Sequence, residues 1–307
     1  MPCPWPAPRR PAGRFRPPLR RPCPGGRRAG RPLTLNCSAR DRGQAACAGG
    51  WSGIVTNAYS GTRRYLALWF PFLPADRLRI QQPDRCSAPT GRPPDAPLVF
   101  TAKVKGALVL CAVDPCAQAL GLAPGLTLAD ARAREPGLVV AEMDADADRH
   151  WLDRLARRCL RWSPQVTPVT PDGITIDITG AAHLFGGEAG LAVQIKDALA
   201  GIGMTLRLAC AATPEAAQAL ARHAPLPIRD EACAIRTLPV IALGLEDEAT
   251  RALQRAGLKT IGALAARPSP ALAARFGAQA VTALRRLTGE EQAPIAPLVP
   301  HRPLRFT

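Results

Sequence analysis

The residues of this chain with the clearest chemical potential lie in one segment, Pro171 to Glu188, which reads Pro-Asp-Gly-Ile-Thr-Ile-Asp-Ile-Thr-Gly-Ala-Ala-His-Leu-Phe-Gly-Gly-Glu. Its first carboxylate, Asp172, could bind a divalent metal ion, but a single carboxylate is a weak ligand for Mg²⁺, which keeps its waters unless several oxygens surround it. Asp177 should be structural, because it lies on the strand face opposite the neighbouring isoleucines. His183 has no carboxylate at a recognisable spacing, so we interpret it as a turn or packing residue.

The cysteines and histidines show no metal-binding pattern. Ten Cys include no Cys-x-x-Cys pair and the four His lie far apart, so no zinc-ligand spacing is present. We expect no secretory signal and no membrane span, because no continuous apolar region of the required length occurs. These features predict a cytoplasmic chain with reduced thiols.

Positive charge is concentrated at the N-terminus. Residues 1–64 hold thirteen Arg and one Asp, and thereby +12 of the formal net charge of +16. The same stretch is rich in proline and poor in apolar periodicity, so we expect residues 1–62 to form a disordered tail. Two interpretations remain open for it: a basic arm that binds nucleic acid, or a start codon assigned too far upstream, which we favour.

The spacing of apolar residues predicts an α+β chain. The predicted strands are Tyr65 to Phe70, a hairpin from Leu98 to Val113, Ile174 to Ile178 and Thr205 to Ala211. The predicted helices are Asp114 to Leu120, Leu126 to Arg134, Asp146 to Trp162, Glu188 to Leu199 and Pro214 to His223. The last third, Pro239 to Gly289, should be helical and broken at glycines and a proline. A βαββαβ order with a small inserted lobe results.

The segment from Thr170 to Gly180 resembles the motif Ser-Ile-Asp-Glu-Ala-Tyr-Leu-Asp-Val-Thr-Gly of the Y-family (UmuC/DinB-like) DNA polymerases, with Asp172, Asp177 and Thr179 among the matches. Its continuation, Asp-Ile-Thr-Gly-Ala-Ala-His-Leu-Phe-Gly-Gly-Glu, resembles the ImuB-type subgroup, which is regarded as non-catalytic. The resemblance implies a Y-family polymerase-like palm (βαββαβ), a small fingers insertion and an all-α, helix-hairpin-helix-like thumb. The implied parts are the tail 1–62, palm 63–75 and 140–235, fingers 76–139, thumb 236–290, and a linker 291–307 toward a little finger expected to be absent from this chain.

The metal-binding residues of the family are mostly replaced. Its first strand ends Val-Asp-Met-Asp-Ala-Phe-Phe, and the matching Ala67 to Leu73 puts Leu68 at the first aspartate and Phe70 at the second acidic position. Gly173 stands where the glutamate of the palm motif belongs. Asp172 is then the one matching metal carboxylate, and the resemblance implies no metal site and no confident catalytic residue.

The triphosphate-binding residues are replaced as well. Where the family has Tyr-x-Ala-Arg-x-x-Gly-Val-x-x-Gly-Met, this chain has Pro115 and Gln118 at the Tyr and Arg positions within an intact glycine frame. Where the family has Asn-Lys-x-Leu-Ala-Lys-x-Ala, this chain has Pro214 and Gln218 at the lysines. The family's residues are replaced at the metal-binding carboxylates, at the Tyr and Arg positions and at the lysines. These replacements predict that nucleotidyl transfer is gone, so that the chain is not an enzyme.

The thumb carries a weak DNA-binding signal. Leu238 to Leu264 resembles the family's helix-hairpin-helix, but Glu246 to Glu248 puts negative charge where a DNA phosphate would bind. Arg251, Arg255 and Lys259 have helical four-residue spacing and are candidate DNA contacts, although a solvated helix face would show the same pattern.

The resemblance implies a catalytically inactive scaffold in bacterial DNA repair, translesion synthesis and damage-induced (SOS) mutagenesis. Its implied partners are an error-prone DNA polymerase, a RecA-like accessory protein, the sliding clamp and, weakly, DNA, with no cofactor. Two alternatives remain open: an active error-prone DNA-directed DNA polymerase that uses Mg²⁺ at Asp172, and a simple DNA-binding module.

Overall fold

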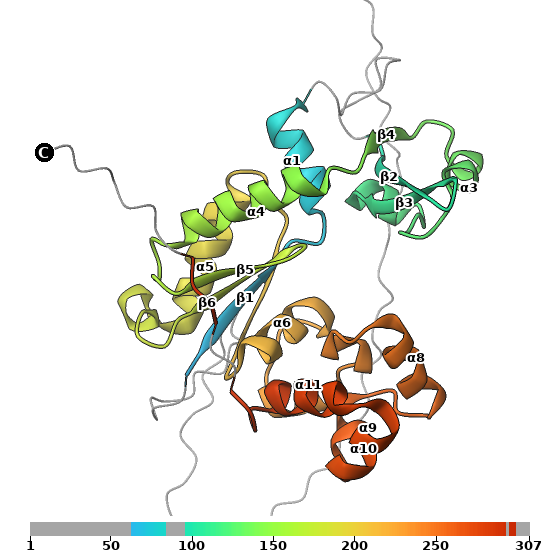
Figure 1. The fold of residues 1–307 in the computed structure, drawn as a ribbon. Coiled ribbons are helices and arrows are strands. Elements are labelled where there is room, and N and C mark those ends of the chain that lie inside the picture. The colour runs from blue at the N-terminus through green and yellow to red at the C-terminus, as the bar shows by residue number, and fades with distance from the viewer. Residues whose placement is uncertain (1–62, 84–95, 293–294, 299–307) are drawn as a thin grey trace, which may run out of the picture. The chain divides into compact units, whose positions relative to one another are not determined.

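A four-stranded sheet forms the centre of the fold (Figure 1). The computed structural model describes residues 63–83, 96–292 and 295–298, so the predicted tail 1–62 lies outside the described residues. The strands are β1 (Tyr65–Trp69), β5 (Val166–Val169), β6 (Gly173–Asp177) and β7 (Arg207–Ala211), in the order β5-β6-β1-β7. All neighbours are antiparallel, and Leu68 in β1 is paired with Ile174 on one side and Leu208 on the other.

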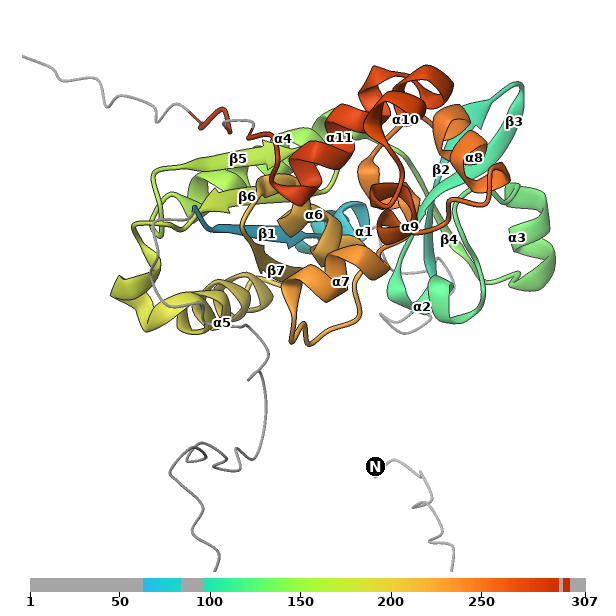
Figure 2. The ribbon, with the colours of Figure 1, turned by 90° about the horizontal axis from the view of Figure 1, so that it is seen from below.

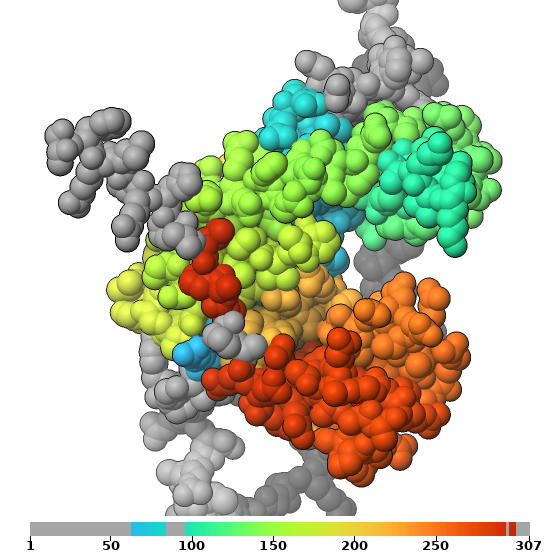
Figure 3. All heavy atoms as spheres, in the orientation of Figure 1, coloured from blue at the N-terminus to red at the C-terminus, as the bar shows by residue number. Residues whose placement is uncertain are grey.

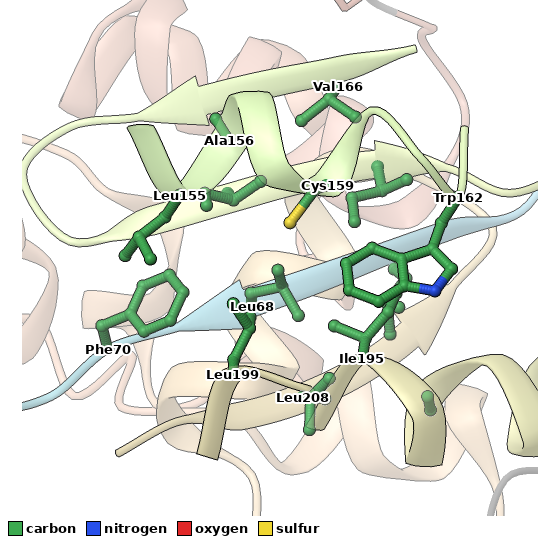
Figure 4. Packing of buried hydrophobic residues seen from close by; sticks show 14 of the residues in the cluster. Leu68, Phe70, Leu155, Ala156, Cys159, Trp162, Val166, Ile195, Leu199 and Leu208 are labelled. Atoms are coloured by element: carbon green, nitrogen blue, oxygen red, sulfur yellow. The ribbon is translucent and has the colours of Figure 1, made fainter. Parts of the chain in front are cut away.

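Helices cover both faces of this sheet (Figures 1 and 2). On one face, α4 (Ala145–Cys159) and α5 (Gly187–Ala200) enclose the larger core, into which Leu68 and Phe70 of the β1 segment point (Figure 4). The other face packs against α6 (Pro214–His223). Burying one face of α4 accounts for its strong amphipathic pattern, because Trp151, Leu155 and Cys159 all lie in the core.

An inserted lobe follows β1 and α1 (Leu73–Gln81). Its three-stranded sheet has the order β3-β2-β4, with β2 (Leu98–Val104), β3 (Ala107–Val113) and β4 (Val139–Glu142). The hairpin turn has positive φ at both Lys105 (48°) and Gly106 (88°), which is the backbone that a two-residue type I′ turn requires. Two short helices, α2 (Pro115–Ala119) and α3 (Leu128–Arg134), complete the lobe.

The C-terminal part of the described chain is helical. It contains α7 (Glu231–Thr237), the 3₁₀ turn η3 (Val240–Leu243), α8 (Asp247–Arg255), α9 (Ile261–Ala265), α10 (Ser269–Phe276) and α11 (Ala278–Thr288). Its apolar residues share a second core with α6 and with Tyr65 and Ala67 of β1. The predicted breaks at Gly244, Gly257 and Gly277 all have positive φ, which glycine adopts without steric cost.

The α+β fold predicted from the sequence is confirmed. The strands and helices of the central sheet follow the order βαββαβ (β1, α4, β5, β6, α5, β7), with the small lobe inserted after β1. The bounds of α6 agree with the prediction, whereas α4 ends at Cys159, so that Trp162 lies in the following turn. Among the described residues, no helix combines the length and apolarity that a membrane crossing needs.

Candidate functional site

Asp172, the candidate metal ligand, is fully engaged by other side chains. It lies in the turn between β5 and β6, where its carbonyl accepts a hydrogen bond of 2.9 Å from the Phe70 N–H. Its Oδ2 accepts from the indole Nε1 of Trp69 at 2.8 Å, and its Oδ1 accepts from Nη2 of Arg222 at 2.6 Å. Both oxygens of the carboxylate therefore have a protein donor, and one donor is a cation.

Trp69 reaches Asp172 because of its register at the end of β1. It is directly opposite Gly173 in β6 and Arg207 in β7, and paired residues in adjacent strands have side chains on the same face. The guanidinium carbon of Arg207 lies 5.6 Å from the centroid of the indole ring. Arg207 also donates to the carbonyl of Ala224, which fixes the guanidinium beside the ring. The indole thus lies beside the position at which Gly173 lacks a side chain.

Leu68 lies on the opposite face of the sheet from this cluster. It is 1% exposed and belongs to the core beneath α4 and α5, as Figure 4 shows. The residue of β1 whose side chain reaches Asp172 is therefore Trp69, one position after Leu68. Strand alternation is the sequence signal that could have found it, since Leu66, Leu68 and Phe70 are the large apolar residues of one face.

Helix α6 supplies the remaining side chains of the site. It begins at Pro214 after the N-cap Thr213, whose Oγ1 accepts from the Ala216 N–H at 3.1 Å. Gln218 and Arg222, one helical turn apart, both point at the sheet. Nε2 of Gln218 donates to the buried Thr175 hydroxyl at 2.9 Å, and Arg222 donates to Asp172. From the sequence, Gln218 was predicted to stand at a lysine position of the family, whereas Arg222 was not predicted to belong to the site.

These residues do not fit the Mg²⁺ ions that a polymerase fold would hold. A metal pair needs several carboxylate oxygens around it, whereas this site offers one carboxylate whose two oxygens already accept hydrogen bonds. A Cβ at Gly173 would lie 3.2 Å from Nη2 of Arg222 and 3.3 Å from the carbonyl oxygen of Val169, so a glutamate there would compete directly with Arg222. The arrangement is a hydrogen-bonded ion pair, and no reaction step through a metal follows from it.

The residues of α2 predicted to replace triphosphate ligands are exposed. Pro115 is the first residue of α2, and Gln118 lies in its next turn. Gly121 and Gly125, the retained glycines, have φ of 77° and 95°, so the backbone requires glycine at both positions without any nucleotide. The fold of the lobe therefore explains why glycine is kept at these two positions.

A buried set of charges connects α1 to its surroundings, and the sequence analysis missed it. Arg77 donates to Asp148 of α4 at 2.5 Å, and both residues are almost fully buried. Asp76 accepts from the Thr205 N–H at 2.7 Å. Burial raises the pKa of the Asp76 carboxyl to about 6, against the opposing effect of the hydrogen bonds from Thr205.

The three candidate DNA contacts lie elsewhere. Arg251 and Arg255 are exposed on α8, and Lys259 is exposed after it. Arg251 lies 3.7 Å from Asp247, with side chains 71% and 91% exposed, so this pair is a weak surface contact. The structure does not bring these residues together with Asp172.

The rest of the Pro171–Glu188 motif has structural roles. Oδ1 of Asp177 accepts from the N–H and the hydroxyl of Thr179, at 2.9 and 2.6 Å. Gly186 and Gly187 have φ of 81° and 86° where the 3₁₀ turn η2 (Ala182–Phe185) meets α5. His183 is exposed on η2. After β6, the motif thus forms the turn that connects this strand to α5.

Solved structures share this fold. The crystal structure of DinB from Sulfolobus solfataricus superposes with a TM-score of 0.58 at 17% identity, covering 76% of this chain and 69% of that chain. A chimera of the Y-family DNA polymerases Dbh and Dpo4 gives a TM-score of 0.61 at 16% identity, with the same coverage. At this identity the likeness shows the fold: the chain has the architecture of a Y-family DNA polymerase.

Sequence comparisons give the same class. Residues 92–222 match the impB/mucB/samB family model. Protein ImuB of Caulobacter vibrioides is 45% identical over 174 residues, which cover 55% of this chain and 38% of that protein. DNA polymerase IV of Dehalococcoides mccartyi (strain CBDB1) is 24% identical over 209 residues, or 66% of this chain and 54% of that polymerase. The chain is thus similar to ImuB and has the fold of the Y-family DNA polymerases, so the predicted resemblance is confirmed. The match spans well under half of the ImuB proteins.

Proposed function

We propose that this chain is a catalytically inactive Y-family polymerase homologue that acts as a scaffold in bacterial DNA repair and damage-induced translesion synthesis. The similarity to ImuB and the polymerase fold support a role related to DNA damage. The observation that carries the inactive, scaffolding part of the proposal is the contact of Asp172 with Arg222 and Trp69. The guanidinium of Arg222, from α6, is bound to the carboxylate that a metal ion would need.

The physical argument concerns charge. Two Mg²⁺ ions in a polymerase neutralise the charge that develops during phosphoryl transfer, and they are held by several carboxylates. Here the positions around Asp172 contribute an indole and a guanidinium, so the charge of the carboxylate is already neutralised before any metal arrives. A divalent cation would have to displace Arg222 and would gain one carboxylate, which does not offset the loss of its hydration.

Metal binding tests this proposal directly. We expect the full chain to show no specific Mn²⁺ binding by electron paramagnetic resonance, and no Mg²⁺- or Mn²⁺-dependent extension of a primed template. The matched control is the triple variant W69D/G173E/R222A, which restores carboxylates around Asp172 and should gain Mn²⁺ binding. Circular dichroism would establish that this variant is folded.

Extension by the unchanged chain that disappears in Asp172→Ala would overturn the proposal. Specific Mn²⁺ binding by the unchanged chain that Asp172→Ala abolishes would also contradict it. The metal measurement needs no primer or template, so it reports on the site even when DNA binding is weak.

We further propose that the scaffold joins an error-prone DNA polymerase, a RecA-like accessory protein and the sliding clamp. This proposal rests on the similarity to ImuB over the matched residues. Size-exclusion chromatography of the purified full chain with each purified candidate tests it. Co-elution with none of the three would contradict the scaffold role while leaving the conclusion about the metal site unchanged.

A further inference from the structure

The outer side of α4 and the turn after it hold a dense group of arginines. Arg154, Arg157, Arg158 and Arg161 are all exposed, and Asp153 is the one acidic residue between positions 153 and 162. We call these four residues the α4 arginine face. In Figure 3 the yellow-green atoms of α4 are open at the surface of the molecule. At a rise of 1.5 Å per residue, Arg154 and Arg158 are about 6 Å apart along the helix axis, and Arg161 lies in the turn that follows the helix.

These arginines lack the acidic partners that the interior arginines have. Arg64 pairs with Glu188 and Glu231, Arg77 with Asp148, and Arg222 with Asp172. Within the part of the chain that the structure describes, no residue of the α4 arginine face forms an ion pair. Some positive charge is expected at a helix C-terminus because of the macrodipole, but that corresponds to about half a unit charge. The four arginines of the α4 arginine face carry several times more positive charge than that.

Two of the four guanidiniums are held in place by aromatic rings. The guanidinium carbon of Arg154 lies 4.7 Å from the ring centroid of Trp151, and that of Arg161 lies 3.9 Å from the ring centroid of Trp162. Both tryptophans are buried in the core of the palm. Stacking of this kind limits the motion of the arginines and reduces the entropy that they lose when they bind an anion.

We propose that the α4 arginine face binds the phosphate backbone of duplex DNA. Duplex DNA carries one negative charge per about 3.4 Å on each strand, so about three phosphates of one strand match the length of this face. Guanidiniums contact phosphates without reading the bases, so the binding is independent of sequence.

The composition of the face favours DNA over an acidic protein. Stable protein interfaces have a central apolar or aromatic anchor, with charges at the rim. Among the described residues, the exposed large apolar side chains belong to other segments, and none lies on α4. An exposed group of arginines without an apolar centre suits a polyphosphate.

This inference goes beyond the proposed function and does not depend on it. The α4 arginine face lies on the side of the central sheet opposite α6 and Asp172. DNA bound there would not pass the former metal site, and it would be bound separately from the thumb residues Arg251, Arg255 and Lys259. A catalytically active chain could have the same face, so primer extension and DNA affinity test different claims.

Salt-dependent DNA binding tests the inference in the full chain. Fluorescence anisotropy would measure the affinity for a duplex between about 50 and 200 mM salt, a range over which phosphate contacts are strongly screened. The variant R157Q/R158Q removes the two arginines that do not stack on tryptophan. We expect a roughly tenfold weaker affinity and a salt slope lower by about 2, because each phosphate contact contributes about 0.9.

Two control variants separate position from charge. R251Q/R255Q removes the same charge from α8 and should leave the slope less changed than R157Q/R158Q does. R157K/R158K keeps the charge on α4 and should retain the salt slope. Protection of Arg157 and Arg158 from phenylglyoxal by duplex DNA, read by mass spectrometry, would support the same location.

Three results would overturn the inference. The first is an unchanged slope in R157Q/R158Q. The second is a loss of slope in R251Q/R255Q alone. The third is a loss of poly-glutamate binding in R157Q/R158Q while duplex binding stays intact, which would assign the face to an acidic protein.

Discussion

Arg222 of α6 lies 2.6 Å from the Asp172 carboxylate, across the same face of the sheet on which Trp69 donates to the other carboxylate oxygen. The sheet thereby presents a neutralised carboxylate where a polymerase of this fold would present metal ligands. The cluster combines one residue from each of three elements: Trp69 of β1, Asp172 of the turn before β6 and Arg222 of α6. Replacing Trp69 or Arg222 alone would leave the other residue hydrogen-bonded to the Asp172 carboxylate.

The first prediction concerns the strength of this cluster. Asp172 and Arg222 are 27% and 25% exposed, so solvent screens their attraction. We expect Arg222→Ala to lower the free energy of unfolding by about 1 kcal/mol, and a double-mutant cycle with Asp172→Asn to give a coupling energy of about 0.5–1 kcal/mol. Chemical denaturation measures both. A coupling energy of zero would mean that the ion pair does not hold the cluster together.

The sequence was sufficient for elements with strong local signals. Helix α6 has a threonine N-cap, Pro214 at its first position and an apolar face, and its predicted bounds are those observed. Strand β5 was not predicted, because four residues that include Pro168 do not read as a strand. Its position at the edge of the sheet explains why proline is tolerated there.

The site could be predicted only in part. Asp172 was identifiable from its motif, but its partners Trp69 and Arg222 lie 103 and 50 positions away in the sequence. Contacts at such separations depend on strand register and on the placement of α6. A shift of one residue on a strand exchanges its two faces, which is why an alignment pointed to Leu68 and the folded chain uses Trp69.

A second prediction follows from Asp76. Its pKa is raised to about 6 by burial, so the folded state binds a proton more tightly than the unfolded state does. This contribution to stability is complete below about pH 4 and is lost as the pH rises through about 6. Relative to Asp76→Asn, the unchanged chain should therefore lose up to about 3 kcal/mol of unfolding free energy between pH 4 and 7. If the unfolding free energies of the two proteins changed in parallel between pH 4 and 7, the raised pKa of Asp76 would be contradicted.

A third prediction concerns the buried pair Arg77 and Asp148. Arg77→Met leaves Asp148 buried without its cation, which should cost about 3–5 kcal/mol. The double variant R77M/D148L removes both charges and should recover most of that loss, because Oδ2 of Asp148 has no hydrogen-bond partner among the residues that the structure describes. Urea denaturation of the three proteins measures the difference. A double variant as unstable as Arg77→Met would show that the pair itself holds α1 on α4.

The last prediction concerns Gly190, in the first turn of α5. A Cβ at Gly190 would lie 2.2 Å from the carbonyl oxygen of Phe185, which is too close for any contact between these atoms. Alanine would otherwise favour a helix over glycine by about 1 kcal/mol, so helix propensity and steric overlap have opposite effects at this position. We expect the overlap to dominate and Gly190→Ala to lower the melting temperature, with a net loss of about 1–3 kcal/mol. Gly180→Ala, in the turn after β6 and with open space around its Cβ, is the control and should change stability by less than about 0.5 kcal/mol. Equal melting temperatures for the two variants would mean that η2 shifts to make room for the added Cβ, and that the glycine at position 190 does not set the approach of η2 to α5.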